Sequence, residues 1–275
     1  MKSFWRLAIY ILLGLYVASI FFFALKPLTG LPMPPMLGPV STIFVWGFAL
    51  LHAGWRLGWR NALVFFSLAF GVWLALEAVG VATGWIYGGY HYSSRLGPQL
   101  LGVPVLIPMS WFMVIYLAYS LSERLAGPWA QARAPGRVLV NVLLGAVVAT
   151  AWDVVADPQM AKSKLWIWDQ PGAFFGVPVQ NFAGWLATAG LVLGLYAALS
   201  RRWPPRSVGE NSGWFDQLPV LAYGALALSF VLGYAAQGEA ALAVIAFFTM
   251  GALALAALAS PQTAGQSPQS GFRAD

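Results

Sequence analysis

The chain has no cysteine, two histidines and few charged residues, and each scarcity excludes a class of protein. Of its 275 residues, 9% are charged and 60% are hydrophobic, whereas a soluble globular domain carries roughly 25% charged residues. The absence of cysteine excludes a disulfide framework, a thiolate metal site and a cysteine nucleophile. His52 and His91 alone are too few for the di-iron sites of histidine-box membrane oxygenases.

Glycine-rich nucleotide motifs are missing as well. The sequence contains no GxGxxG, GxxxxGK[ST] or GxSxG pattern, so a Rossmann nucleotide site, a P-loop and a serine-hydrolase elbow have no support. We therefore expect an activity that needs no cofactor and no metal. His52 is expected to be a packed polar residue, and His91 an interfacial one.

Long apolar runs dominate what is present. Runs of about the 20 residues needed to cross a bilayer occur near residues 5–25, 40–58, 61–83, 103–123, 138–157, 179–200, 218–236 and 240–259. They predict an all-α, polytopic integral membrane protein with about eight transmembrane helices. Residues 1–259 would form a single transmembrane domain, followed by a disordered tail at 260–275. The first run is expected to be an uncleaved anchor, because no small-x-small cleavage site follows it.

The tight turn at 237–239 leaves open whether the last two runs are both full spans. With eight spans, the basic residues divide unequally between the two faces of the membrane. One face would hold only Lys26, Arg95, Lys162 and Lys164. The other would hold Lys2, Arg6, Arg56, Arg60, Arg124, Arg133, Arg137, Arg201, Arg202, Arg206 and Arg273. Because lysine and arginine concentrate on the cytoplasmic side, both termini are predicted to be cytoplasmic. The net charge of +6 is then a topology signal, and no nucleic-acid partner is expected.

Two segments of the chain share a sequence pattern. The predicted external loops GWIYGGYHYSSRLGPQLLG (84–102) and PQMAKSKLWIWDQPGAFFG (158–176) are both rich in glycine and aromatic residues. They continue into GVPVLIPMSW (102–111) and GVPVQNFAGW (176–185). A favourable helix start explains each proline, but not the shared neighbours or the matched tryptophan. We expect a parallel tandem repeat of spans 3–4 and 5–6, with units at about 61–123 and 138–200 and a site at their interface.

Three acidic residues lie clearly within predicted spans. A carboxylate there costs roughly 2.5–3.5 kcal/mol on insertion scales, so Glu77, Asp153 and Asp157 are candidate catalytic residues. All three are expected at a similar depth in the outer half of the membrane, and the spacing of four places both aspartates on one helix face. A purely structural role stays open, above all for Asp157, which precedes Pro158 at a helix end.

Aromatic residues surround these acids in the sequence. Most of the 14 tryptophans are expected to be interfacial anchors. The aromatic residues in or beside the repeated element are different, because they could line a site: Trp85, Tyr87, Tyr90, Tyr92, Trp111, Trp166, Trp168 and Trp185. Aromatic faces stabilise a cation by about 0.5–2 kcal/mol, and burial favours a neutral carboxylic acid. Such a site suits protonation of an apolar alkene, followed by capture of the carbocation by water or by an internal double bond.

Two stretches resemble a known family. The sequence from Glu77 through GVPVLIPMSW, and more strongly DVVADPQMAKSKLWIWDQPGAFFGVPVQNFAGW (153–185), resembles the signatures of CruF-type carotenoid biosynthesis proteins. The resemblance covers about residues 77–190, and the polar stretch 162–164 departs from the pattern. It implies hydration of the terminal double bond of an acyclic carotenoid end group, in lycopene, γ-carotene or a similar molecule, to a tertiary alcohol. Carotenoid 1',2'-hydratases and bisanhydrobacterioruberin hydratases are members.

The resemblance also implies site residues. Carried over position by position, it favours Glu77, Tyr90, Asp153, Asp157, Pro158, Trp168, Gly176, Pro178, Asn181, Phe182 and Trp185. We predict that Glu77 or Asp153 is the general acid, and that Asp157, with Asn181, orients the water and takes up its proton. The predicted substrate-binding residues are Tyr90, Trp111, Trp168, Asn181 and Trp185. An apolar carotenoid and membrane lipid are the expected partners, with other carotenoid biosynthesis enzymes as further candidates, in the plasma membrane of a bacterium or archaeon.

Other functions stay open at this point. Asp153 and Asp157 form a DxxxD pattern of the kind that magnesium-dependent membrane prenyltransferases use, although a second acidic cluster is missing. A carotenoid cyclase would use the same acid chemistry without water. A non-catalytic carotenoid-binding or transport protein would bind or move the pigment unchanged, with Glu77 as a coupling site.

Overall fold

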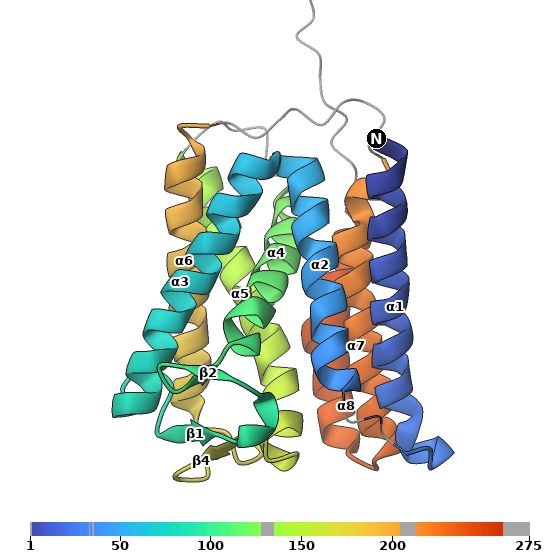
Figure 1. Cartoon of the computed structure of the whole chain (residues 1–275), viewed down its shortest axis with the longest axis vertical. Helices are drawn as coiled ribbons and strands as arrows, with labels where there is room; N and C mark the ends of the chain where they lie inside the picture. Colours follow the sequence, from blue (N-terminus) through green and yellow to red (C-terminus); the bar gives the residue numbers. More distant parts are fainter. Residues whose placement is uncertain (1, 33, 35, 128–134, 204–212, 261–275) are drawn as a thin grey trace, which may run out of the picture.

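A computed structural model shows the chain as a bundle of long helices (Figure 1). The structure describes residues 2–32, 34, 36–127, 135–203 and 213–260. The predicted tail after Ser260 and the basic residues Arg133, Arg206 and Arg273 lie outside this part of the chain. Eight described segments are long and apolar enough to cross a membrane, which confirms the predicted all-α polytopic architecture.

The spans follow one another as simple helices up to the last. They are α1 (Lys2–Thr29), α2 (Leu37–Leu57), α3 (Trp59–Thr83), α4 (Leu106–Leu125), α5 (Pro135–Lys162), α6 (Val179–Ser200) and α7 (Leu218–Ala236), with the short η3 (Phe215–Gln217) before α7. The eighth span combines α8 (Ala240–Ala246), the π-helical η4 (Phe247–Gly251) and α9 (Ala252–Ala259). The last two apolar runs are therefore separate spans.

Glycine sets the helix ends on both sides of α3. Gly58 has a φ of 82° between α2 and α3, and Gly84 has a φ of 70° after α3, a backbone region that glycine enters without steric cost. The fourth span begins three residues later than expected, at Leu106. The reason is that β3 (Val103–Pro104) pairs with β2 (Gln99–Leu100) in a small hairpin before the helix starts.

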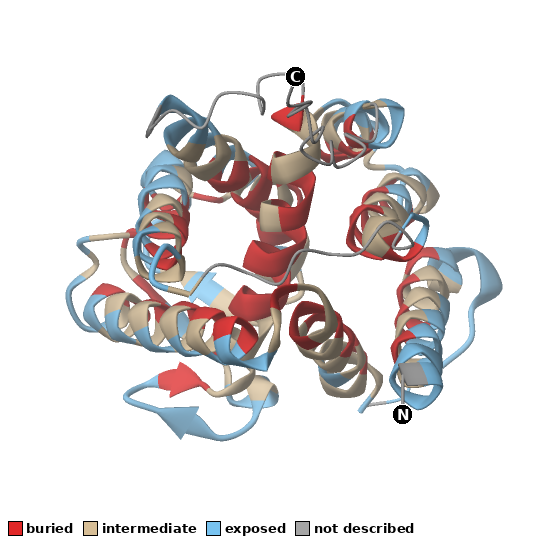
Figure 2. Cartoon of the chain, turned by 90° about the horizontal axis from the view of Figure 1, so that it is seen from above, coloured by how far each residue is buried: buried red, intermediate tan, exposed pale blue. Residues whose placement is uncertain are grey.

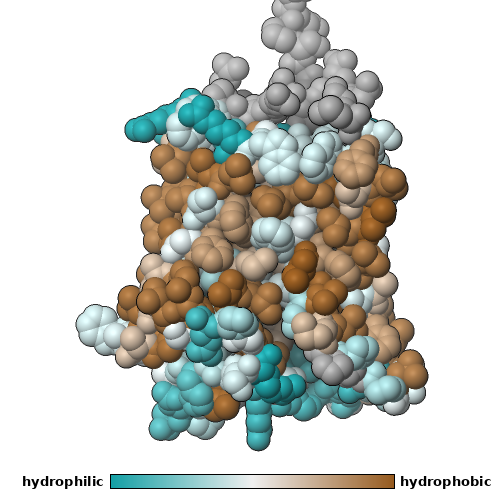
Figure 3. All heavy atoms as spheres, in the orientation of Figure 1, coloured by the Kyte–Doolittle hydropathy of each residue, from teal (hydrophilic) through white to brown (hydrophobic). Residues whose placement is uncertain are grey.

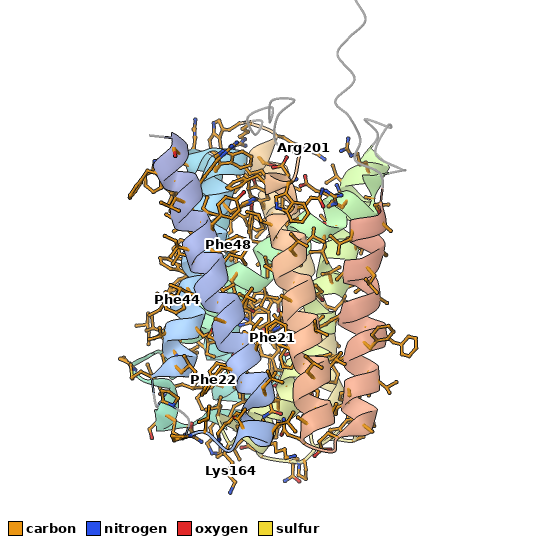
Figure 4. All side chains as sticks on the ribbon, turned by 90° about the vertical axis from the view of Figure 1, so that its right-hand side faces the viewer. Phe21, Phe22, Phe44, Phe48, Lys164 and Arg201 are labelled. Atoms are coloured by element: carbon orange, nitrogen blue, oxygen red, sulfur yellow. The ribbon has the colours of Figure 1, made fainter. Side chains whose placement is uncertain are left out.

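α4 lies at the centre of the bundle. It is the most buried of the eight spans and contacts α2, α3, α5, α7 and α9. Seen from above, buried residues gather at the middle of the bundle and exposed residues at its rim (Figure 2). The rim is a broad hydrophobic band between two more polar ends (Figure 3), as a lipid-facing surface requires. Arg201 and Lys164 lie at opposite ends of the molecule (Figure 4).

The two aromatic loops pair with each other. Strand β1 (Tyr90–Tyr92) runs antiparallel to β4 (Trp166–Trp168), and the central pair of the register is His91 with Ile167. The matched tryptophans Trp111 and Trp185 also contact each other.

The shared Gly-Val-Pro-Val phrase has the same backbone geometry in both places. Leu101 and Gly102 have φ values of 55° and 80°, and Phe175 and Gly176 have values of 49° and 87°. Two consecutive residues with positive φ are rare, yet both loops contain such a pair directly before Val-Pro and the next helix. This correspondence supports the repeat units at about 61–123 and 138–200, which stay a prediction.

Candidate active site

A cavity of about 740 Å³ lies toward the end of the bundle that carries β1 and β4, here called the sheet end. Helices α3 to α6 form one wall, and α1, α2 and α7 form the other. Every residue predicted for the site lines it: Glu77, Tyr90, Trp111, Asp153, Asp157, Trp168, Asn181 and Trp185. Among the other residues favoured by the resemblance, Pro158 and Gly176 border a separate cavity of about 370 Å³, and Phe182 packs against Phe174.

Glu77 is held by two phenols. It lies on α3, one and a half turns before the helix ends, and is only 4% exposed. Tyr92 donates a hydrogen bond of 2.9 Å to its Oε2 atom, and Tyr90 donates to the same atom. Burial, together with the nearby Glu77 charge, raises the pKa of both phenols well above 10.0. Strand β1 therefore supplies Glu77 with two donors that stay protonated at physiological pH.

Asp153 and Asp157 are bridged by one amide. Both lie on the same face of α5, and each is 2% exposed. The Nδ2 atom of Asn181 on α6 donates to Oδ2 of Asp153 at 2.7 Å and to Oδ2 of Asp157 at 2.6 Å. Trp166 on β4 donates from Nε1 to Oδ1 of Asp157 at 2.6 Å. Helix α5 thus brings a pair of carboxyl groups to the cavity, whereas α3 brings one.

The three acids differ in how many of their carboxyl oxygens accept hydrogen bonds. Both oxygens of Asp157 accept hydrogen bonds. Glu77 and Asp153 each accept these hydrogen bonds on one oxygen, which leaves the other oxygen free of the phenols and of the amide. The Trp73 side chain, one turn earlier on α3, also lies within reach of the Glu77 carboxyl. Since both residues line the cavity and neither free oxygen is sealed inside the protein, these two oxygens are the groups that can react with a bound molecule.

Four tryptophans form a layer next to the acids, called here the tryptophan layer: Trp73, Trp111, Trp152 and Trp185. Trp73 stacks on Trp111, which also contacts Trp185. Trp152 lies 5.4 Å from Trp185, measured between ring centroids. Trp111, Trp152 and Trp185 line the cavity, so the acids share it with indole rings from α4, α5 and α6.

The cavity opens toward the sheet end. Lys26, Arg95 and Gln237 lie at this end of the bundle and line it. In the opposite direction the core is filled, and Phe65 and Phe112 are 0% exposed. The sheet end is therefore the side on which charged and polar residues line the cavity.

Sequence reasoning missed some of these residues and placed others wrongly. Tyr92 and Trp166 were candidates only as aromatic lining, whereas they donate hydrogen bonds to the acids. Trp85, another candidate, is 81% exposed and points away from any site. Tyr87 is buried but does not line the cavity, and its hydroxyl lies 3.0 Å from that of Thr188. No sequence pattern predicted that α1, α2 and α7 would form a wall of the cavity. Their part in it follows only from the positions of their side chains in the structure.

The two histidines have the expected surroundings. His52 is fully buried on α2 and hydrogen-bonds the Tyr116 hydroxyl at 2.6 Å and the Phe215 carbonyl at 2.9 Å. His91 is exposed on β1, beside Asp169. Neither lines the cavity that holds the acids.

Comparison with known proteins identifies the family. The family model described as "Carotenoid biosynthesis protein" matches residues 37–254. The bisanhydrobacterioruberin hydratase of Haloarcula japonica is 38% identical over 122 residues, which are 44% of this chain and 40% of that protein. The match thus spans less than half of that relative. No solved structure matches the chain. Because the family model covers most of the chain, including all three acids of the cavity, this protein belongs to the carotenoid biosynthesis protein family.

Proposed function

We propose that the protein is a carotenoid hydratase, which adds water to the terminal double bond of an acyclic carotenoid end group such as that of lycopene or γ-carotene. One observation carries the proposal: carboxyl groups from both repeat units, Glu77 and the pair Asp153 and Asp157, face one aromatic cavity among membrane-spanning helices. Family membership supports it, as does the hydratase activity for which the relative from Haloarcula japonica is named.

Glu77 is the proton donor in this proposal. Tyr90 and Tyr92 fix one carboxyl oxygen as an acceptor, so the proton resides on the other oxygen, which faces the cavity. That proton bonds to the less substituted carbon of the alkene as the π bond breaks. The positive charge then lies on the tertiary carbon, the more stable position. General acid catalysis of this kind contributes roughly 10²–10⁴-fold to the rate.

The tryptophan layer stabilises the carbocation. An aromatic face attracts a cation by about 0.5–2 kcal/mol or more when water is excluded, and Trp111, Trp152 and Trp185 present three such rings to the cavity. Unlike a hydroxyl or a carboxylate, these rings offer the cation no oxygen that would capture it before water does.

The aspartate pair delivers the water. Asn181 and Trp166 occupy both oxygens of Asp157, which makes Asp157 the positioning group. Asp153 has a free oxygen and accepts the proton that the water loses as its oxygen bonds to the tertiary carbon. Proton exchange with solvent at the sheet end then restores Glu77 and Asp153. The balance is one alkene plus one water giving one tertiary alcohol.

The test is expression in cells that accumulate lycopene or γ-carotene, followed by mass analysis of the extracted pigment. The proposal expects a product heavier by one water that carries a tertiary hydroxyl. A cyclase would give a product of unchanged mass, and a binding or transport protein would leave the pigment unaltered. Unchanged pigment from folded, membrane-inserted protein would refute the proposal.

Single substitutions test the catalytic roles of Glu77 and Asp153. Glu77→Gln keeps the shape and the phenol contacts but cannot donate the proton, so hydration should fall by roughly 10²-fold or more. The hydration activity of Asp153→Asn should fall by a similar factor. Asp169→Asn is the matched control, because Asp169 is an exposed acid beside the same strands. Full activity in both cavity variants would show that the acids are wrongly assigned.

A further inference from the structure

The cavity extends well beyond the acids. On the side opposite Glu77 it is walled by α1, α2 and α7. This part, called the arm, is lined by Tyr16, Ile20, Val45, Leu226 and Phe230. The proposed reaction needs none of these residues. An extension of this kind has to accommodate a part of the bound molecule that does not react.

The wall of the arm is chemically apolar although it contains hydroxyl groups. Ser41 is 2.6 Å from the Ser19 hydroxyl, and the hydroxyls of Thr42 and Ser229 each bond a carbonyl of their own helix. Lys26 is the charged residue that α1, α2 and α7 contribute to the cavity lining, and it lies at the sheet end. These three hydroxyls are satisfied within the protein, whereas the Tyr16 hydroxyl is buried without a hydrogen-bond partner among the described residues. Most of the wall therefore favours hydrocarbon over polar groups.

The cavity lining follows α1 over a considerable length. Lys26 and Tyr16 both line the cavity and are ten residues apart, which corresponds to roughly 15 Å along the helix axis at 1.5 Å per residue. The acids line the same cavity from α3 and α5, across from this stretch of α1. A molecule with one end group at Glu77 can therefore continue into the arm as an extended chain.

Helix α1 lies outside the part of the chain that the family model matches. The match to the family model begins at residue 37, after α1 has ended at Thr29. The catalytic wall thus belongs to the shared part of the chain, whereas α1 contributes Tyr16 and Ile20 from outside it.

We propose that the arm holds the polyene chain behind the reacting end group, and that α1 determines which chain lengths the protein accepts. The proposal rests on the proposed hydration, because that reaction supplies the apolar, elongated substrate. Ile20 and Leu226 are its specificity residues, since they approach the arm from α1 and α7.

The experiment fills the arm and compares two substrates. Ile20→Trp and Leu226→Trp add bulk inside it. Leu15→Trp and Leu228→Trp are matched controls on the same two helices, where the side chains are 44% and 50% exposed and face outward. Each variant is assayed with lycopene and with farnesene, a short isoprenoid hydrocarbon that carries the same terminal double bond.

The arm variants should hydrate lycopene about tenfold more slowly or worse, as expected when a well-fitted space is overfilled. Farnesene hydration should stay within about twofold, because the short chain does not reach the filled region. Both controls should keep both activities. Lycopene hydration at control levels in the arm variants, or an equal loss with both substrates, would overturn the proposal.

A binding measurement separates this proposal from the reaction. Bound lycopene is expected to quench the fluorescence of the tryptophan layer, so its affinity is measurable in protein that does no chemistry. If the wild-type protein hydrates neither substrate, the proposed function fails. Weaker lycopene binding in the arm variants than in the controls would still support the arm, and equal binding would refute it.

Discussion

Removing the amide of Asn181 is the most direct test of the acid cluster. Asn181→Leu keeps a side chain of similar size but abolishes both hydrogen bonds, of 2.7 Å to Asp153 and 2.6 Å to Asp157. A bond to a charged acceptor contributes about 1.5–3 kcal/mol and a bond to a neutral acceptor about 0.5–1.5 kcal/mol. If the aspartate pair carries one negative charge when water attacks, the two losses total about 2–4.5 kcal/mol.

That free energy is expected to appear in the rate. When the water is no longer positioned, a loss of about 2–4.5 kcal/mol lowers hydration roughly 30- to 2,000-fold. The assay is pigment conversion per unit of membrane-inserted protein. Asn181→Asp is the companion variant, because it conserves size and removes the donor, so it should lose activity as well.

Asn61→Leu is the matched control. Asn61 is also a buried asparagine, 5% exposed, and its Nδ2 donates to the Leu57 carbonyl near the other end of the bundle. Its replacement should change stability but leave conversion intact. If folded Asn181→Leu protein converts pigment within about threefold of the wild type, the amide bridge is not part of the mechanism.

Two further expectations concern the loops. Burial and the nearby Glu77 charge raise the pKa of Tyr90 and Tyr92 well above 10.0; a pKa raised in the folded state stabilises the fold below about pH 10 and loses that contribution above it. Melting temperatures measured against pH should therefore fall above about pH 10, and less steeply in the double Tyr→Phe variant; identical slopes would contradict this reasoning. Gly102→Ala and Gly176→Ala each place a Cβ in the left-handed region and should cost about 1–2 kcal/mol of unfolding free energy. Similar losses in thermal melts in detergent would agree with the repeat, and a large loss at one site alone would not.

Local properties of the sequence predicted most of the fold. Eight spans follow from apolar length, which each segment carries by itself. The similar depth of Glu77 and Asp153 follows from their distance to the helix ends, because an α-helix rises a fixed length per residue. The matched motifs at 102–111 and 176–185 predicted a correspondence that recurs in their backbone, where both have two consecutive residues with positive φ. All of these features can be read from neighbouring residues.

Contacts between distant segments could not be predicted in this way. The bond from Tyr92 to Glu77 depends on how the loop after α3 folds back, and the bond from Trp166 to Asp157 depends on the turn after α5. The pairing of β1 with β4 joins loops that four helices of alternating direction bring together. The arm has no sequence pattern at all, because an apolar residue that faces a cavity resembles one that faces lipid.

The opening of the cavity at the sheet end has an energetic consequence for the cell. Fully buried phenylalanines fill the core toward the opposite end, where Arg56 and Glu123 form an ion pair at 2.8 Å. In the proposed reaction, a proton consumed at Glu77 and a proton released at Asp153 would both be exchanged at the sheet end, with the same aqueous compartment. No net charge would then cross the bilayer during a turnover. Hydration would therefore leave the transmembrane potential unchanged, and the rate of hydration would not depend on that potential.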